Sequence, residues 1–143
     1  MRVDLNSSKL MYLDELLFSE KLIVKRSKIH RWGVFAREPI KKYEILEEFP
    51  YFKIPAEELT DGSSCTRYSY ALNNEFAIIG MGFCGLYNHS SDANVEYEID
   101  RVNEVMRHYA IADIEVGEEL TLNYGVDDAS WFNEEWKIKI NKQ

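Results

Sequence analysis

The sequence contains no long apolar run and very little cysteine. No stretch approaches the roughly 18 consecutive apolar residues of a membrane-spanning helix, and no basic start followed by an apolar segment marks a secretory signal. We therefore expect an intracellular, soluble protein with no membrane partner. Among 143 residues only Cys65 and Cys84 are cysteines, and His30, His89 and His108 are widely spaced. These residues do not predict a tetrahedral zinc site, and a disulfide would stay reduced inside a cell, so we expect no metal.

Positive charge is also scarce. The chain has 25 acidic against 17 basic residues and a formal net charge of −8. A surface that binds nucleic acid must neutralise phosphates, so this balance argues against a nucleic-acid partner. It is compatible with basic partners such as lysine- and arginine-rich peptide tails. An acidic surface that only promotes solubility is the simpler interpretation of the charge.

Apolar residues make up 45% of the chain, which is enough for one core, but the length is too short for two comfortable domains. Most apolar segments are short, β-prone and separated by glycine, proline or polar residues. We expect strands at residues 22–24, 33–36, 44–49, 76–79, 95–99, 106–112 and 119–122. Leucines spaced by three and four predict a helix over 9–19, and short helices are also compatible with 53–62 and 131–140. The pattern predicts a mostly β (β+α) fold of several small β-sheets with short helices.

Three segments carry polar or glycine residues in suggestive patterns. Residues 30–36 read His-Arg-Trp-Gly-Val-Phe-Ala, where the glycine allows a close approach of the backbone to a ligand or another strand. Residues 88–94 read Asn-His-Ser-Ser-Asp-Ala-Asn, which is typical of a loop fixed by side-chain hydrogen bonds. Residues 117–125 read Gly-Glu-Glu-Leu-Thr-Leu-Asn-Tyr-Gly. Taken alone, each segment is explained by a turn, a loop or a buried tyrosine with a backbone partner.

Together, and in this order, the three segments resemble the SET domain of protein lysine methyltransferases. The family patterns are Gly-x-Gly-Val-Phe-Ala, Asn-His-Ser-x-x-Pro-Asn and Gly-Glu-Glu-Leu-Thr-x-Asp-Tyr-Gly. This chain departs from them at Arg31 in place of the first glycine, Ala93 in place of the proline and Asn123 in place of the aspartate. Within the family the chain is most similar to the small stand-alone SET proteins of large algal viruses.

The resemblance runs from about Leu22 to Phe132. It implies a SET-domain fold with a knot-like C-terminal threading. It divides the chain into an N-terminal helical extension at 1–20, a SET domain at 21–132 and a short C-terminal flank at 133–143. A SET domain without flanking domains also needs other residues to cover its core. Formation of a homodimer is one way to cover it.

The resemblance implies that S-adenosylmethionine is the cofactor. The backbone of residues 31–33 would hold its methionine part, Asn88 its amino acid end and the His89 backbone the adenine edge. Asn94 would brace the loop. The full set of residues expected at the cofactor is Arg31, Trp32, Gly33, Asn88, His89, Tyr124 and Trp131.

The same family likeness places a narrow channel for a lysine side chain at Tyr124. A lysine amine has a solution pKa of about 10.4 and cannot accept a methyl group while it is protonated. An apolar channel and a nearby positive charge both lower that pKa, so no general base is required. The catalytic tyrosines would be Tyr124, Tyr68 and Tyr97, and the channel would be lined by Trp32, Tyr68, Tyr97, Leu122 and Phe132.

The function that follows is transfer of methyl groups to the ε-amine of a protein lysine, with a basic histone-like tail as the favoured substrate. With histones as substrate the protein would work in the nucleus of a host cell, and otherwise in the cytoplasm. The alternative is a SET-like peptide-binding module with weak or no turnover, and a β-rich structural protein with a fortuitous likeness is a third interpretation. Cofactor binding and turnover distinguish these alternatives.

We predict that Tyr97→Phe shifts the product toward higher methylation. Loss of a hydroxyl beside the amine would leave space for an additional methyl group. Mass spectra of the methylated substrate would show the ratio of mono-, di- and trimethylated lysine. An unchanged ratio in the variant would contradict the placement of Tyr97 in the channel.

Overall fold

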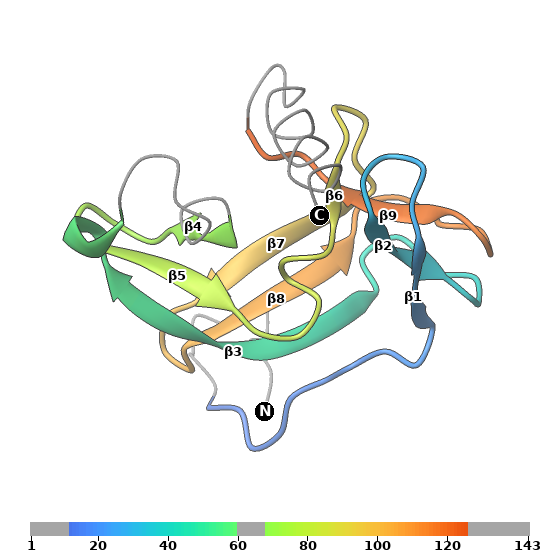
Figure 1. The fold of residues 1–143 in the computed structure, drawn as a ribbon. Coiled ribbons are helices and arrows are strands. Elements are labelled where there is room, and N and C mark those ends of the chain that lie inside the picture. The colour runs from blue at the N-terminus through green and yellow to red at the C-terminus, as the bar shows by residue number, and fades with distance from the viewer. Residues whose placement is uncertain (1–11, 60–67, 126–143) are drawn as a thin grey trace. The chain divides into compact units, whose positions relative to one another are not determined.

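The computed structural model describes residues 12–59 and 68–125, and nine strands and one 3₁₀ helix have defined bounds in this part (Figure 1). Contacts divide the chain into two units. One consists of residues 1–20, 43–85 and 97–109, and the other of residues 21–42, 86–96 and 110–143. Among the described residues, no helix has the length and apolar character that crossing a membrane requires. The expected mostly β fold is confirmed.

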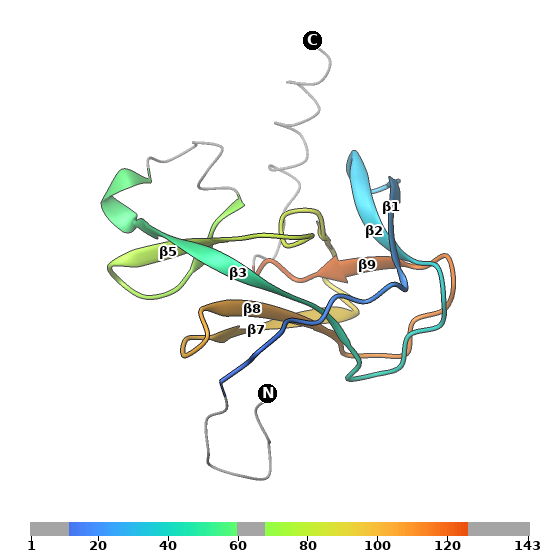
Figure 2. The ribbon, with the colours of Figure 1, turned by 90° about the horizontal axis from the view of Figure 1, so that it is seen from below.

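The first unit is built on a five-stranded sheet of order β4-β5-β3-β8-β7 (Figures 1 and 2). The long strand β3 lies at its centre and pairs antiparallel with both β5 and β8. A cluster of buried side chains forms its core, with Ile78 and Met106 fully buried. The strands are β3 (Ile45–Pro55), β4 (Tyr70–Ala71), β5 (Phe76–Gly80), β7 (Val95–Asp100) and β8 (Val105–Ala110).

The second unit is built on a four-stranded sheet of order β1-β2-β9-β6. Strands β1 and β2 form an antiparallel hairpin, and β2 pairs antiparallel with β9. Strand β6 runs parallel to β9, with Asn88 opposite Thr121 and His89 opposite Leu122. The strands are β1 (Leu22–Arg26), β2 (Trp32–Ala36), β6 (Asn88–His89) and β9 (Glu119–Leu122).

All seven expected strands are present, and β3 is longer than predicted because it continues through residues 50–55. The 3₁₀ helix η1 (Ala56–Glu58) follows directly, within the segment expected to be a loop or short helix. The two-residue strands β4 and β6 were not predicted. The expected helix at 131–140 lies outside the described residues.

The predicted helix over 9–19 is wrong for residues 12–19, which are not helical. Their backbone groups bond to β3 instead, because Ser19 N–H donates to Leu46 O at 2.9 Å and Leu17 O accepts from Glu48 N–H at 2.7 Å. Phe18 forms a bridge with Glu47. The leucine spacing therefore belongs to an extended segment along the edge of β3, where Leu17 stays partly exposed.

We predict that Gly82→Ala destabilises the protein more than Gly117→Ala. Both glycines have positive φ, of 69° and 89°, which costs a side-chain-bearing residue about 1–2 kcal/mol. A Cβ at Gly82 would also lie 2.6 Å from Phe49 Cε2, whereas nothing lies within 4 Å of one at Gly117. Overpacking adds about 1–3 kcal/mol. Urea unfolding measures both free energies, and equal losses would contradict the contact with Phe49.

Candidate functional site

Asn88 lies at the centre of the polar contacts in the second unit. It is buried on β6, and its side-chain Nδ2 donates to His30 O at 3.1 Å, Trp32 O at 3.1 Å and Glu119 Oε1 at 2.8 Å. Because all three partners are acceptors, the amide nitrogen must face them. Asn88 therefore fixes the turn before β2 and attaches it to the start of β9.

Asn94 performs a similar task six residues later. Its Nδ2 donates to Glu119 O at 2.9 Å, and its Oδ1 accepts from Thr121 N–H at 2.9 Å. The side chain thus bonds the β9 backbone as a neighbouring strand would. Its own carbonyl accepts from Ile111 N–H at 2.9 Å. Asn94 braces the loop, as its place in the motif predicted.

Tyr124 follows β9 and is held at both ends. Its hydroxyl donates to Tyr87 O at 2.6 Å, and its backbone N–H donates to His89 Nδ1 at 3.1 Å. The His89 ring lies against the Tyr124 ring, with centroids 5.1 Å apart. Since His89 Nδ1 accepts a hydrogen bond, a neutral His89 carries its proton on Nε2. Tyr124 remains 41% exposed, so a fixed aromatic ring faces outward.

Glu119 explains why the start of β2 needs a glycine at position 33. A Cβ at Gly33 would collide with the Glu119 carboxylate, which accepts from Ser27 Oγ at 2.9 Å as well as from Asn88. Neither Ser27 nor Glu119 was singled out from the sequence. Their 92-residue separation leaves no local pattern by which to find the pair.

Arg31 adopts φ 42°, the left-handed conformation that glycine would adopt without strain. Arg31 therefore adopts, at the position of the family glycine, a backbone conformation that glycine favours. Beside it, the Arg26 guanidinium lies 4.2 Å from the centroid of the Trp32 ring. These two residues are opposite each other in the β1–β2 register, and this cation–π contact orients the indole.

The other expected channel tyrosines belong to the unit with the five-stranded sheet. The Tyr97 ring packs edge-on against Tyr70, with centroids 4.8 Å apart, and the Tyr70 hydroxyl donates to Cys84 O at 2.7 Å. Tyr68 Cδ1 would lie 3.4 Å from a Cβ at Gly85. Tyr70 was missed, because β4 has only two residues and shows no periodicity in the sequence.

Buried polar side chains also occur in this unit. Burial lowers the pKa of His108 to about 3, so its imidazole is neutral at physiological pH. The pKa of the Cys84 thiol is raised, mainly by burial and to a smaller extent by the negative charge of Glu47. Arg107 is buried with its Nε 2.6 Å from Glu48 Oε2, which compensates both charges.

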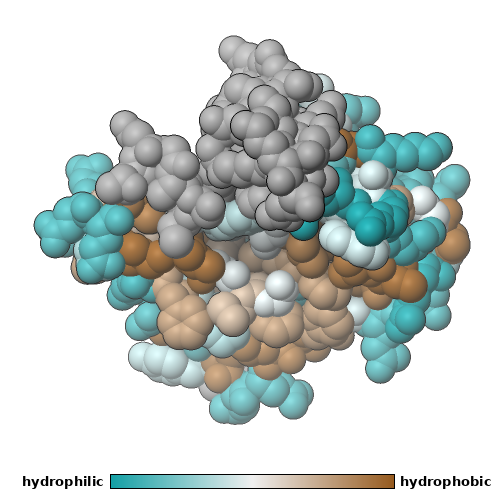
Figure 3. Space-filling model, viewed as in Figure 1, coloured by the Kyte–Doolittle hydropathy of each residue, from teal (hydrophilic) through white to brown (hydrophobic). Residues whose placement is uncertain are grey.

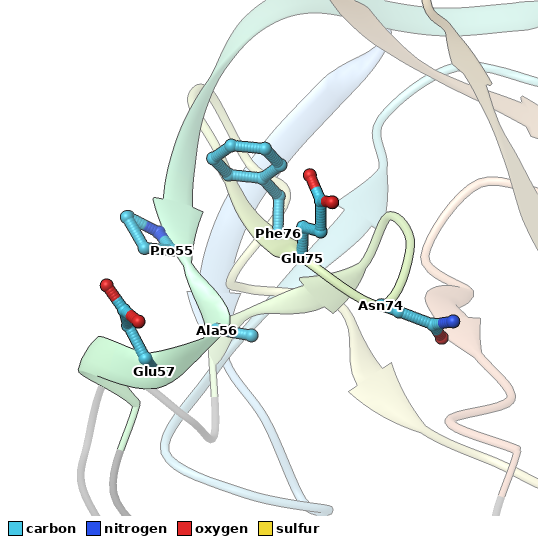
Figure 4. A pocket seen from close by; sticks show the side chains of 6 residues that line it. All are labelled: Pro55, Ala56, Glu57, Asn74, Glu75 and Phe76. Atoms are coloured by element: carbon cyan, nitrogen blue, oxygen red, sulfur yellow. The ribbon is translucent and has the colours of Figure 1, made fainter.

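A surface hollow of about 470 Å³ lies where β3 ends and β5 begins (Figure 4). The residues that line it are Pro55, Ala56, Glu57, Asn74, Glu75 and Phe76. None of the predicted site residues is among them. The face drawn in Figure 3 also shows apolar surface over β3 and β5, and Phe52 of β3 is 61% exposed.

Comparison with protein families gives a match to the SET domain over residues 31–125, about two thirds of the chain. The chain belongs to the SET-domain family. The match begins at Arg31 in the turn before β2 and ends at Gly125, directly after Tyr124. The second and third motifs, the first motif from Arg31 onward and both ends of the Asn94 contacts therefore lie within the matched range.

Three curated relatives are histone-lysine N-methyltransferases. The Schizosaccharomyces pombe enzyme specific for H3 lysine-37 is 30% identical over 106 residues, which are 72% of this chain and 71% of that protein. The Eremothecium gossypii enzyme specific for H3 lysine-4 is 31% identical over 82% of this chain. MEDEA from Arabidopsis thaliana is 31% identical over 79% of it. The chain spans only 13% and 18% of the last two proteins.

Solved structures agree with the SET assignment. A Plasmodium falciparum protein described as a histone methyltransferase superposes with a TM-score of 0.64 at 31% identity, covering 80% of this chain and 99% of that one. A humanized mutant of Chaetomium thermophilum Polycomb Repressive Complex 2, bound to the inhibitor GSK126, gives 0.61 at 26% identity over 73% of this chain and 15% of that one. The SET-domain fold is confirmed, and the likeness to algal viral proteins stays a prediction.

The structure gathers most of the predicted cofactor residues in one unit. One hydrogen bond joins Asn88 to Trp32, and another joins Tyr124 to His89. Leu122 is buried and lies opposite His89 in the β6–β9 pair. The predicted roles of these residues, of Tyr68 and of Tyr97 stay predictions. The expected cofactor residue Trp131 and the expected channel residue Phe132 lie outside the described residues.

We predict that Arg31→Gly stabilises the protein by up to about 1.5 kcal/mol. Glycine avoids the cost of a left-handed side-chain-bearing residue, about 1–2 kcal/mol, but loses about 0.5–1 kcal/mol through its greater freedom when unfolded. Arg37→Gly is the matched control, because Arg37 has no positive φ and should only lose stability. Urea midpoints of the two variants give the comparison, and a lower midpoint for Arg31→Gly would contradict the strain at this residue.

Proposed function

We propose that the protein is an S-adenosylmethionine-dependent protein-lysine N-methyltransferase that acts on a basic, histone-like tail. The observation that carries this proposal is the arrangement around Tyr124. Its hydroxyl is bonded to Tyr87 O and its backbone to His89, while Asn88 fixes the turn that the family uses for its cofactor. The histone-lysine methyltransferases among the relatives support the reaction.

The residues of the four-stranded unit fit the cofactor that the family uses. S-adenosylmethionine supplies a methyl group on a positively charged sulfur. Trp32 and Tyr124 are 42% and 41% exposed, so two aromatic surfaces are available for packing against a ligand. The turn at 30–33 keeps its left-handed residue and its glycine. We assign cofactor binding to the backbone of 31–33, to Asn88, His89 and Tyr124, and to Trp131 as an expectation of the family likeness.

The donor and acceptor roles of the Tyr124 hydroxyl are fixed. Because its single proton is donated to Tyr87 O, its oxygen offers only lone pairs to any further neighbour. Such an oxygen can accept a hydrogen bond from a lysine N–H but cannot donate one to the amine lone pair. The Tyr124 oxygen therefore aligns a neutral lysine amine. The lone pair of the amine nitrogen, which attacks the methyl group, points away from this oxygen. Catalysis by positioning of this kind does not need a general base.

The substrate preference rests on charge and on the relatives. The chain carries a net charge of −8, which favours association with a lysine-rich segment. The S. pombe relative is named for H3 lysine-37 and the E. gossypii relative for H3 lysine-4. We assign a histone tail as substrate and the nucleus as the place of action. Complex formation like that of the Polycomb neighbour, or the homodimer expected from the sequence, would supply additional partners.

The alternative of an inactive peptide-binding module rested on Arg31, Ala93 and Asn123. Arg31 adopts the left-handed backbone in spite of its side chain, so this departure does not alter the turn. Asn123 uses its side chain locally, accepting from Gly125 N–H at 2.9 Å. Neither departure removes a contact to Tyr124. Turnover is therefore the better supported of the two functions.

We predict that the protein transfers label from methyl-labelled S-adenosylmethionine to lysine in core histones. Tyr124→Phe should lower the rate about 100-fold or more, since loss of the aligning oxygen misplaces the amine. Tyr12→Phe, at a 68% exposed tyrosine, is the matched control and should retain the rate. Scintillation counting and mass spectrometry identify the labelled lysine.

Two outcomes would contradict parts of the proposal. Equal rates for Tyr124→Phe and Tyr12→Phe would exclude the role given to the Tyr124 hydroxyl. Binding of the cofactor without label on histones or on whole-cell lysate would favour the peptide-binding module. Isothermal titration with S-adenosylmethionine distinguishes that result from failure to bind the cofactor.

A further inference from the structure

Three buried side chains of metal-binding type meet in the five-stranded unit. Glu47 lies on β3, His108 lies opposite it on β8, and Cys84 lies in the segment after β5. Their exposed fractions are 0%, 0% and 2%. None of them belongs to the SET motifs, and the proposed methyl transfer uses none of them.

The ligand atoms lie within 4 Å of one another, and only the nitrogen–oxygen pair is too far apart for a hydrogen bond, since the Cys84 thiol donates weakly to Glu47. His108 Nδ1 lies 3.6 Å from Glu47 Oε1, while normal N–H···O bonds measure about 2.7–3.2 Å. Cys84 Sγ lies 3.7 Å from Glu47 Oε1 and 3.9 Å from His108 Nδ1. Three atoms of the types that bind metal ions, an oxygen, a sulfur and a nitrogen, therefore face one another in a buried triangle.

The centre of this triangle has the dimensions of a zinc site. With sides of 3.6, 3.7 and 3.9 Å, the point equidistant from the three atoms lies about 2.2 Å from each. Zinc binds nitrogen and oxygen at about 2.0–2.2 Å and sulfur at about 2.3 Å. An ion at this point would therefore be within bonding distance of all three atoms without movement of the backbone.

Neighbouring groups orient the Glu47 carboxylate and fix the backbone of Cys84. The second carboxylate oxygen of Glu47, Oε2, accepts from Phe83 N–H at 3.0 Å, so Oε1 is the oxygen that faces Cys84 and His108. The Tyr70 hydroxyl donates to Cys84 O at 2.7 Å. Such supporting contacts are typical of metal sites, where they orient the ligands.

The surrounding residues also allow a close approach of the thiol and limit rotation of the imidazole. A Cβ at Gly80 would lie 2.6 Å from Cys84 Sγ, so only glycine leaves room for the sulfur. The His108 ring is flanked by the Tyr97 ring, with centroids 5.9 Å apart. The ligand atoms are thus placed by residues from several strands.

We propose that Glu47 Oε1, Cys84 Sγ and His108 Nδ1 bind one zinc ion inside the five-stranded unit. On binding, the Cys84 thiol releases its proton to solvent, and a thiolate, a carboxylate and a neutral imidazole balance the two charges of the ion. A carboxylate, an imidazole and a thiolate together favour zinc over magnesium or calcium, which prefer oxygen ligands alone. With three protein ligands, a water molecule would take the fourth position of a tetrahedral ion, and since burial leaves the ion no access to a protein substrate, its role is structural.

Cobalt(II) tests this site by a signal that is independent of methyltransferase activity. The full-length protein, refolded with one equivalent of cobalt, should show the near-ultraviolet charge-transfer band of a cobalt–thiolate bond. Cys65→Ser is the matched control and should keep the band, whereas Cys84→Ser should lose it. The apparent cobalt affinity of Cys84→Ser should fall by about 100-fold or more.

A second measurement keeps the test decisive if Cys84→Ser does not fold. Zinc should raise the unfolding temperature of the wild-type protein, a chelator should lower it, and His108→Gln should respond to neither. One zinc ion per chain should remain after dialysis. Loss of the band in Cys65→Ser in place of Cys84→Ser would overturn the proposal, as would a folded wild-type protein with no cobalt–thiolate band and no response to zinc.

Discussion

Two asparagine side chains attach strand β9 to β6, in addition to the pairing of β9 with β2. Strand β6 has only two residues, too few for a backbone ladder to fix the parallel partner β9. Asn88 and Asn94 supply the missing hydrogen bonds, from Asn88 to the Glu119 side chain and from both ends of the Asn94 amide to the β9 backbone. Each of these hydrogen bonds contributes about 1 kcal/mol net. Together they help to position β9, the strand that leads to Tyr124.

A second constraint lies between β3 and β8, where two adjacent cross-strand pairs are polar and buried. Glu47 is opposite His108, and Glu48 is opposite Arg107. Successive residues of a strand face opposite sides of the sheet, so polar partners occupy both faces at this point. A slip of one residue would place each carboxylate against the wrong partner. Buried polar pairs therefore specify the register more strictly than apolar residues of similar size would.

The sequence was most informative where a strand has enough residues to show a pattern. β1 and β2 contain β-branched and aromatic residues over five positions, and both were predicted. β4 and β6 have two residues each, which no periodicity can reveal. The leucines before residue 20 showed helical spacing, but the hydrogen bonds that β3 offers to Leu17 and Ser19 outweigh that local preference.

For the site, the motifs predicted Gly33, Asn88 and Tyr124 because each belongs to a short segment whose residues act together. The geometry of Arg31 could not be predicted, since an arginine rarely adopts a positive φ. The contact between Cys84 and His108 could not be predicted either. They are 24 residues apart and meet only because β8 pairs with β3.

The pairing of β2 with β9 has a consequence for synthesis of the chain. Val34 on β2 is fully buried and lies opposite Leu120, so this edge of the hairpin has no partner until β9 leaves the ribosome. Translation at about 5–20 residues per second leaves an apolar strand edge uncovered for several seconds. An uncovered edge of this kind is a template for pairing with other nascent chains. The order of the strands along the chain therefore creates an interval in which this edge of the growing polypeptide is open to such pairing.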